Sequence, residues 1–228
     1  MDFFYYRAAN NVGASGNFSR AYACSSTSKF LWILSDDEIL NEFSLLIIYK
    51  LLCKVGKQPS IVCFNSYQNG FPFVGTCKDW ICTAIHDRIS AISAVTLISS
   101  VIFERRLFCL DTFWHYEGHW FPHSYAVFGT AISLDVNIVV LQSSCYIVES
   151  GNTAEERFAN KDQPSILLLN LEFQTACLHF INYCLVLAGL SQYSSQKYVD
   201  LVSFQFSVPS DIICKGMKPI DNLLLKSA

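Results

Sequence analysis

Residues 118–148 read GHWFPHSYAVFGTAISLDVNIVVLQSSCYIV, and the spacing of their apolar residues changes within this stretch. Over 124–134 the apolar residues recur every three to four positions, which predicts a short amphipathic helix with Ser124 as its cap. Residues 136–141, VNIVVL, are β-branched and almost continuously apolar, which predicts a buried strand. The sequence therefore predicts a helix that leads directly into a strand.

Further elements are expected on both sides of this stretch. Upstream, helical spacing covers 35–52, where Asp36-Asp37-Glu38 suits a helix start, and also about 80–103. A loop with glycine and proline separates these two helical segments. The remaining predicted strands are 145–148 and 165–169, which share one sheet with 136–141, and a half-exposed strand at 203–208.

The predicted fold class is α+β, with a small mixed β-sheet packed between helices, because helices come first and strands later. Residues 1–30 show no sustained periodicity and are predicted to form an irregular N-terminal arm. The remaining residues, 31–228, are enough for one domain with a buried core.

The composition argues against several classes of protein. With 52% hydrophobic and only 15% charged residues, the chain cannot be a disordered segment solvated by its charges. A net charge of −3 and the lack of a long Lys/Arg cluster exclude a nucleic-acid partner. The ten cysteines are scattered, without a C-x-x-C pair, and the N-terminus does not resemble a secretory signal. We therefore expect reduced thiols in a cytoplasmic protein, with no metal and no other cofactor.

Two uncharged segments leave a membrane-associated protein as an alternative. Residues 89–103 are too short to cross a bilayer. Residues 173–196 are long enough, but they include His179, Asn182 and three glutamines, which are costly inside a membrane. A membrane partner is therefore not expected. The alternative uses 89–103 and 173–190 as apolar helices.

Cysteine and histidine are the residues best able to supply catalytic chemistry, because a thiol beside an imidazole can act as a nucleophile. Gly118-His119-Trp120 precedes the predicted helix and the strand Ile138-Val139-Val140, and His179-Phe180 follows the apolar run 166–169. This order and spacing resemble the ovarian-tumour (OTU) family of cysteine proteases over about residues 55–185. In that family, a glycine, a tryptophan and a histidine precede a helix and an I-x-V strand, and a later loop carries the catalytic histidine.

The resemblance implies an OTU-like fold and a deubiquitinase, which hydrolyses isopeptide bonds to ubiquitin or a ubiquitin-like protein. It implies Cys63 as the nucleophile at the start of a helix, His179 as the base and Asn182 as the group that orients the imidazole. Ser60-Ile61-Val62 stands where the family has Asp-Gly-x before its cysteine, and Ile181 stands where an orienting residue is common. Impaired catalysis is therefore expected.

Three alternatives accompany this hypothesis. Cys77, which follows Gly75-Thr76, is the second candidate nucleophile. His115, His119 and His123 are spaced by four and would form a zinc site on an unbroken helix, but Gly118 and Pro122 interrupt that helix. The alternative function is non-enzymatic: an interaction module, or the membrane-associated protein described above.

Overall fold

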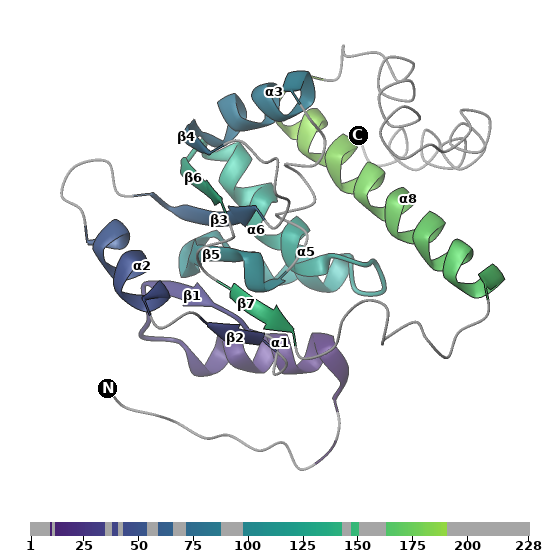
Figure 1. The fold of residues 1–228 in the computed structure, drawn as a ribbon, viewed down its shortest axis with the longest axis horizontal. Coiled ribbons are helices and arrows are strands. Elements are labelled where there is room, and N and C mark those ends of the chain that lie inside the picture. Colours follow the sequence, from purple (N-terminus) through teal and green to yellow (C-terminus); the bar gives the residue numbers. More distant parts are fainter. Residues whose placement is uncertain are drawn as a thin grey trace.

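A five-stranded mixed sheet lies at the centre of the structure, a computed structural model (Figure 1). In spatial order its strands are β1 (Phe30–Trp32), β5 (Val101–Glu104), β3 (Ile61–Asn65), β6 (Asn137–Gln142) and β4 (Phe73–Thr76). β3 and β6 are parallel, and the other neighbouring strands are antiparallel. A separate antiparallel pair is formed by β2 (Glu38–Leu40) and β7 (Ile147–Ser150).

The structure describes residues 10, 12–34, 38–40, 43–53, 59–65, 72–87, 98–142, 147–150 and 163–190. Within them lie six α-helices: α1 (Gly13–Cys24), α2 (Ser44–Leu52), α3 (Cys77–Asp87), α5 (Leu110–His115), α6 (Pro122–Ser133) and α8 (Gln163–Leu187). Two short 3-10 helices flank β5, namely η1 (Ile98–Ser100) and η2 (Arg105–Leu107). The protein is therefore an α+β protein, as the sequence predicts.

The two faces of the sheet carry separate cores because side chains alternate along each strand. Ile61 and Cys63 of β3 belong to the larger core, which includes residues of α1, α3, α5, α6 and α8. Val62 and Phe64 point to the other face, where Ile48 of α2 packs on them. Figure 1 shows α2 on one side of the sheet and α6 and α8 on the other. Among the described residues, α2 thus covers one face of the sheet and the other five helices contribute to the core on the opposite face.

α8 packs closely on α6 through aromatic side chains. The Phe180 ring lies 5.2 Å from the Tyr125 ring and 5.9 Å from the Phe128 ring, both in edge contact. Tyr183 lies against Gly129, where an added Cβ would be 2.2 Å from the tyrosine hydroxyl oxygen. Glycine at 129 therefore allows the close approach of the two helices.

The helix and the strand that are predicted at the centre of residues 118–148 are confirmed. Helix α6 covers 122–133, against 124–134 predicted, and β6 covers 137–142, against 136–141. Ser124 is not the cap, because Phe121 occupies that position. The helix predicted over 35–52 is only partly confirmed, since 38–40 form β2 and α2 begins at Ser44.

Other predicted elements differ from the structure. Of the helix predicted over 80–103, residues 80–87 lie in α3 and are confirmed, whereas 98–103 form η1 and part of β5, and 88–97 lie outside the described residues. The strand predicted at 165–169 is wrong, because these residues lie in α8. β7 pairs with β2 and not with the main sheet. The strand predicted at 203–208 lies outside the described residues.

Residues 13–32 include a helix and a strand, whereas an irregular arm is expected over residues 1–30. α1 occupies Gly13–Cys24, and β1 adds an edge strand that pairs with β5. Phe18 is buried, and its ring lies 5.1 Å from both the Phe108 and the Phe113 rings. Phe18 and Tyr22, whose ring lies 4.5 Å from the Phe108 ring, thus attach α1 to the larger core, although the helix has no sustained apolar period.

Candidate functional site

Cys63, the first candidate nucleophile, lies in the middle of β3 and not at the start of a helix as expected. It pairs with Val101 of β5 on one side and with Val140 of β6 on the other. The residue is fully buried. A residue inside a sheet uses its backbone groups in the ladder, so they are not free to stabilise a tetrahedral intermediate. Position 63 therefore lacks the local geometry that a nucleophile requires, and the helix start expected for Cys63 is wrong.

Cys77, the second candidate, does begin a helix. It is the first residue of α3 and directly follows Gly75 and Thr76 of β4. Its backbone N–H donates to the Val136 carbonyl oxygen at 2.9 Å, and the Lys78 N–H donates to the Asp135 carboxylate at 3.1 Å. The backbone N–H groups of Cys77 and Lys78 are therefore already used.

The thiols near Cys77 are held in their neutral form. Burial, with a smaller effect of Asp135, raises the pKa of Cys77 to about 12. Burial, with a smaller effect of Cys77, raises the pKa values of Cys63 and Cys184 well above the ordinary value. Among the described side chains, no imidazole contributes to any of these three pKa values. The thiolate that a nucleophile needs is thus disfavoured.

His179 lies within α8, whereas the OTU resemblance implies a loop beside the sheet. Asn182 is half-buried three residues later on the same helix, a spacing at which two side chains can touch. Burial, with a smaller effect of His119 from the turn before α6, lowers the pKa of His179. Neither candidate cysteine contributes to this pKa.

No protein-family model, curated protein or solved structure matches this chain. The geometry of its own residues is therefore the basis on which a function can be inferred.

The alternative zinc site does not have the expected geometry. His115 ends α5, His119 lies in the following turn and His123 belongs to α6. Gly118, with φ of +93°, makes the turn that separates them. Within the described ranges, no three His, Cys, Asp or Glu side chains are placed to hold a metal ion.

The described helices also bear on the membrane alternative. None of them, α8 included, combines the length and the apolar character needed to cross a bilayer. The segment 89–103 lies largely outside the described residues.

Cys109 is the one described thiol whose pKa is lowered. The Thr112 side chain is the main cause, and backbone N–H groups at the start of α5 add to it. The residue is only partly buried. Its place before a short helix explains the effect, because the first N–H groups of a helix have no partner within the helix. Sequence analysis did not identify Cys109, although Cys109-Leu-Asp-Thr112 resembles a helix start.

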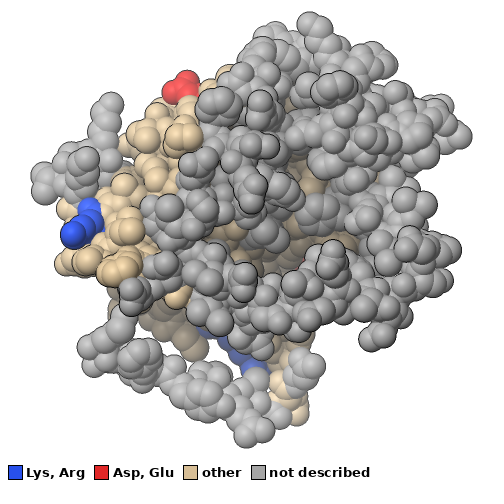
Figure 2. Space-filling view, in the orientation of Figure 1, with Lys and Arg blue, Asp and Glu red and all other residues tan. Residues whose placement is uncertain are grey.

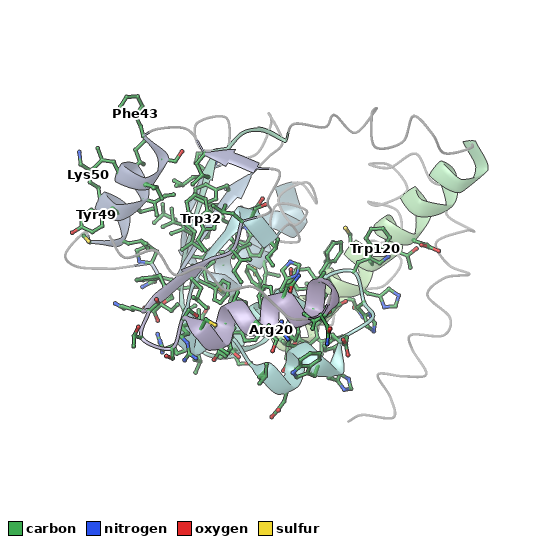
Figure 3. All side chains as sticks on the ribbon, turned by 90° about the horizontal axis from the view of Figure 1, so that it is seen from below. Arg20, Trp32, Phe43, Tyr49, Lys50 and Trp120 are labelled. Atoms are coloured by element: carbon green, nitrogen blue, oxygen red, sulfur yellow. The ribbon has the colours of Figure 1, made fainter. Side chains whose placement is uncertain are left out.

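The outer face of α2 is the most prominent apolar surface among the described residues. Ser44 and Ile48 point to the sheet, but the rest of the helix is apolar as well. Its exposed residues are Phe43 (58% exposed), Leu45, Leu46 (51%), Ile47 and Tyr49 (65%). In Figure 3, Phe43, Tyr49 and Lys50 project away from the body of the protein, whereas Trp32 lies on the side of α2 that faces the body of the protein. We call the five apolar residues Phe43, Leu45, Leu46, Ile47 and Tyr49 the α2 surface.

The α2 surface has little charge. The described surface at the left of Figure 2, over α2, is mostly neither acidic nor basic. Lys50 is exposed in the last turn of the helix. A helix that is apolar on all sides is normally buried on all sides, so the exposed outer face of α2 is a candidate interaction site. Its sequence, FSLLIIYKLL over 43–52, carries this signal, which our sequence analysis interpreted only as a packed helix.

Proposed function

We propose that this protein is a non-enzymatic interaction module that binds ubiquitin or a ubiquitin-like protein through the α2 surface. The observation that supports it most is the exposure of five large apolar side chains on one short helix. The partner class comes from the OTU resemblance over residues 55–185. An OTU-like fold that has lost its catalysis remains part of this proposal.

Exposure of the α2 surface to water has a free-energy cost that a partner would remove. Full burial of one large aliphatic or aromatic side chain stabilises a protein by about 1.5–3 kcal/mol. Several such residues, next to one another on a rigid helix, can supply the apolar centre of an interface. Ile48 and the adjacent Val62, Phe64 and Ile102 hold that helix against the sheet. The surface is therefore presented by a fixed scaffold.

The state of the thiols supports binding over catalysis. Cys77 has the helix-start position that the family gives its nucleophile, but its thiol is buried and its pKa is raised to about 12. Cys63 lies within a sheet, and His179 lies within a helix. The described cysteines are all free thiols, which fits the cytoplasm as the proposed location.

Leu46→Glu is expected to weaken ubiquitin binding at least tenfold. The substitution replaces an apolar side chain, 51% exposed, at the centre of the α2 surface with a charge, and it keeps good helix propensity. Leu134→Glu is the matched control, because Leu134 is similarly exposed at 57% but lies at the end of α6. We expect it to change the dissociation constant less than twofold. Isothermal titration of each variant with ubiquitin measures both effects.

Four outcomes would contradict the proposal. Equal binding by Leu46→Glu and wild type would exclude the α2 surface. No binding by wild type would exclude ubiquitin as the partner. Wild-type dimers that Leu46→Glu abolishes, or binding of wild type to phospholipid vesicles, would assign the surface to a second copy or to a membrane.

A ubiquitin probe with a C-terminal electrophile is expected to leave Cys63 and Cys77 unlabelled. Neither buried thiol can reach the probe or form a thiolate readily. Intact-mass measurement after incubation near pH 7.5 tests this. Fast labelling that is lost in Cys77→Ala would instead establish an active cysteine protease.

A further inference from the structure

Three basic residues lie at the corner of the protein where β1 begins and β5 ends. Lys29 directly precedes β1, and Arg105 and Arg106 directly follow β5 at the start of η2. The two strands are antiparallel neighbours, which brings the two segments together, and the Arg105 N–H donates to the Lys29 carbonyl oxygen at 2.9 Å. We call Lys29, Arg105 and Arg106 the basic corner.

Glu104, the last residue of β5, positions two of these three cations. Its carboxylate accepts a hydrogen bond from the Arg106 Nε–H, and the Lys29 Nζ lies 3.9 Å from it. The Glu104 side chain is only 10% exposed, whereas the side chains of Lys29 and Arg106 are 61% and 62% exposed. One buried carboxylate thus holds two exposed cations, and most of each cationic side chain stays accessible to a partner.

Arg105, the third cation, is held by an aromatic ring. Its guanidinium carbon lies 4.3 Å from the centre of the Tyr22 ring, and the Tyr22 ring lies 4.5 Å from the Phe108 ring of the larger core. Among the described residues, no carboxylate pairs with Arg105, and its Nε is buried without a hydrogen-bond partner. Stacking on the tyrosine fixes the guanidinium group but brings no acid to neutralise its charge.

The basic corner concentrates positive charge in a protein that is acidic as a whole. The two segments that form it, 12–34 and 98–110, contain Arg20 and the basic corner but only one acid, Glu104. The whole chain has a net charge of −3. Figure 2 shows basic side chains in the lower part of the view, at the level of α1 in Figure 1. Local charge of this kind attracts an acidic partner.

An acidic peptide segment fits the basic corner better than a single small anion does. Exposed ion pairs are individually weak, because water and salt screen them. Several carboxylates on one segment can pair with all three cations at once, and linked contacts strengthen one another. Each arginine can also bind a carboxylate through two parallel hydrogen bonds. The net negative charge of the chain disfavours a nucleic acid at this surface.

We propose that the basic corner is a second interaction surface, which binds an acidic segment of a partner protein through Lys29, Arg105 and Arg106. This surface is distinct from the α2 surface, because it acts through charge and the α2 surface acts through apolar contact. The rigid position of the three cations, held by Glu104 and Tyr22, lowers the entropy that is lost on binding.

Fluorescence anisotropy with a labelled peptide of eight glutamates tests the basic corner at pH 7.5 in 50 mM salt. The double variant Lys29→Gln/Arg105→Gln is expected to raise the dissociation constant at least tenfold, and it keeps the pair of Arg106 and Glu104. Raising the salt to 500 mM should weaken wild-type binding at least tenfold as well. Lys50→Gln/Lys78→Gln is the matched control, because it removes the same charge from α2 and α3, and we expect a change below twofold.

The absence of peptide binding by wild type in 50 mM salt would overturn the proposal, as would an unchanged dissociation constant in Lys29→Gln/Arg105→Gln. An equal loss in the control variant would show that net charge alone determines binding. Wild-type binding to phosphatidylserine vesicles but not to the peptide would assign the corner to a membrane.

If the double variant does not fold, cross-linking of wild type decides. A carbodiimide joins a bound glutamate carboxylate to a lysine amine, and peptide mass spectrometry identifies the lysine. We expect the cross-link at Lys29. Cross-links only at lysines outside the basic corner would exclude this surface.

Discussion

Phe180→Ala is expected to lower the free energy of unfolding by about 3–5 kcal/mol. Phe180 is fully buried on α8, and its ring makes edge contacts with Tyr125 and Phe128 of α6. Loss of the ring removes these contacts and leaves a cavity where α6 and α8 meet. Unfolding in urea, followed by circular dichroism, measures the change.

Val186→Ala is the control for this prediction. Val186 lies on the same helix but is 45% exposed, so we expect a change within about 0.5 kcal/mol. A loss below about 1 kcal/mol for Phe180→Ala would mean that α8 contributes little to the folded state. Similar losses in both variants would contradict the burial of Phe180 as the cause, because alanine has a higher helix propensity than either residue that it replaces.

Cys109 is expected to react with iodoacetamide at least 100-fold faster than Cys77 in the folded protein. The pKa of Cys109 lies below 9.0, whereas that of Cys77 is raised to about 12. Three pH units between an ordinary thiol and Cys77 correspond to about 1000-fold less thiolate. Burial of Cys77 slows its reaction further. Peptide mass spectrometry after short exposure to the reagent near pH 8 assigns the modified positions.

Thr112→Val provides the control for Cys109. Valine keeps the shape of threonine but removes the hydroxyl group that is the main cause of the lowered pKa. The reaction of Cys109 should therefore slow, while those of the exposed Cys24 and Cys53 stay unchanged. Equal rates for Cys77 and Cys109 in wild type would contradict the burial on which our argument against catalysis depends. Denaturant should remove the difference between the two thiols.

The parts of the fold that the sequence predicted well have clear local signals. β6 is β-branched and apolar, and α6 has regular apolar spacing. Residues 165–169 gave the wrong element because a short apolar run fits a buried helix as well as a strand. α1 gave no periodic signal, since the tertiary contacts of Phe18 hold it in place.

The candidate site was predicted less well than the fold. Cys63 was placed at a helix start by its position relative to Trp120, but its own neighbours, IVCF over 61–64, are typical of a buried strand. The strand propensity of residues 61–64 predicted the structure around Cys63 better than the spacing between Cys63 and Trp120. The contacts of Tyr183 with Tyr116 and Tyr125 had no local signal, because they form only when α8 docks on the α5–α6 turn. Resemblance alone could not place these side chains.

The strand order has a consequence for the kinetics of folding. In the order β1-β5-β3-β6-β4, no two neighbours in the five-stranded sheet are consecutive in the chain. The central parallel pair joins residues 61–65 to residues 137–142, so a long loop must close before these two strands can pair. Such long-range pairing gives a high contact order, which slows folding to milliseconds or longer. During synthesis, β3 can pair with β5 first, but its other edge must wait until β6 has left the ribosome.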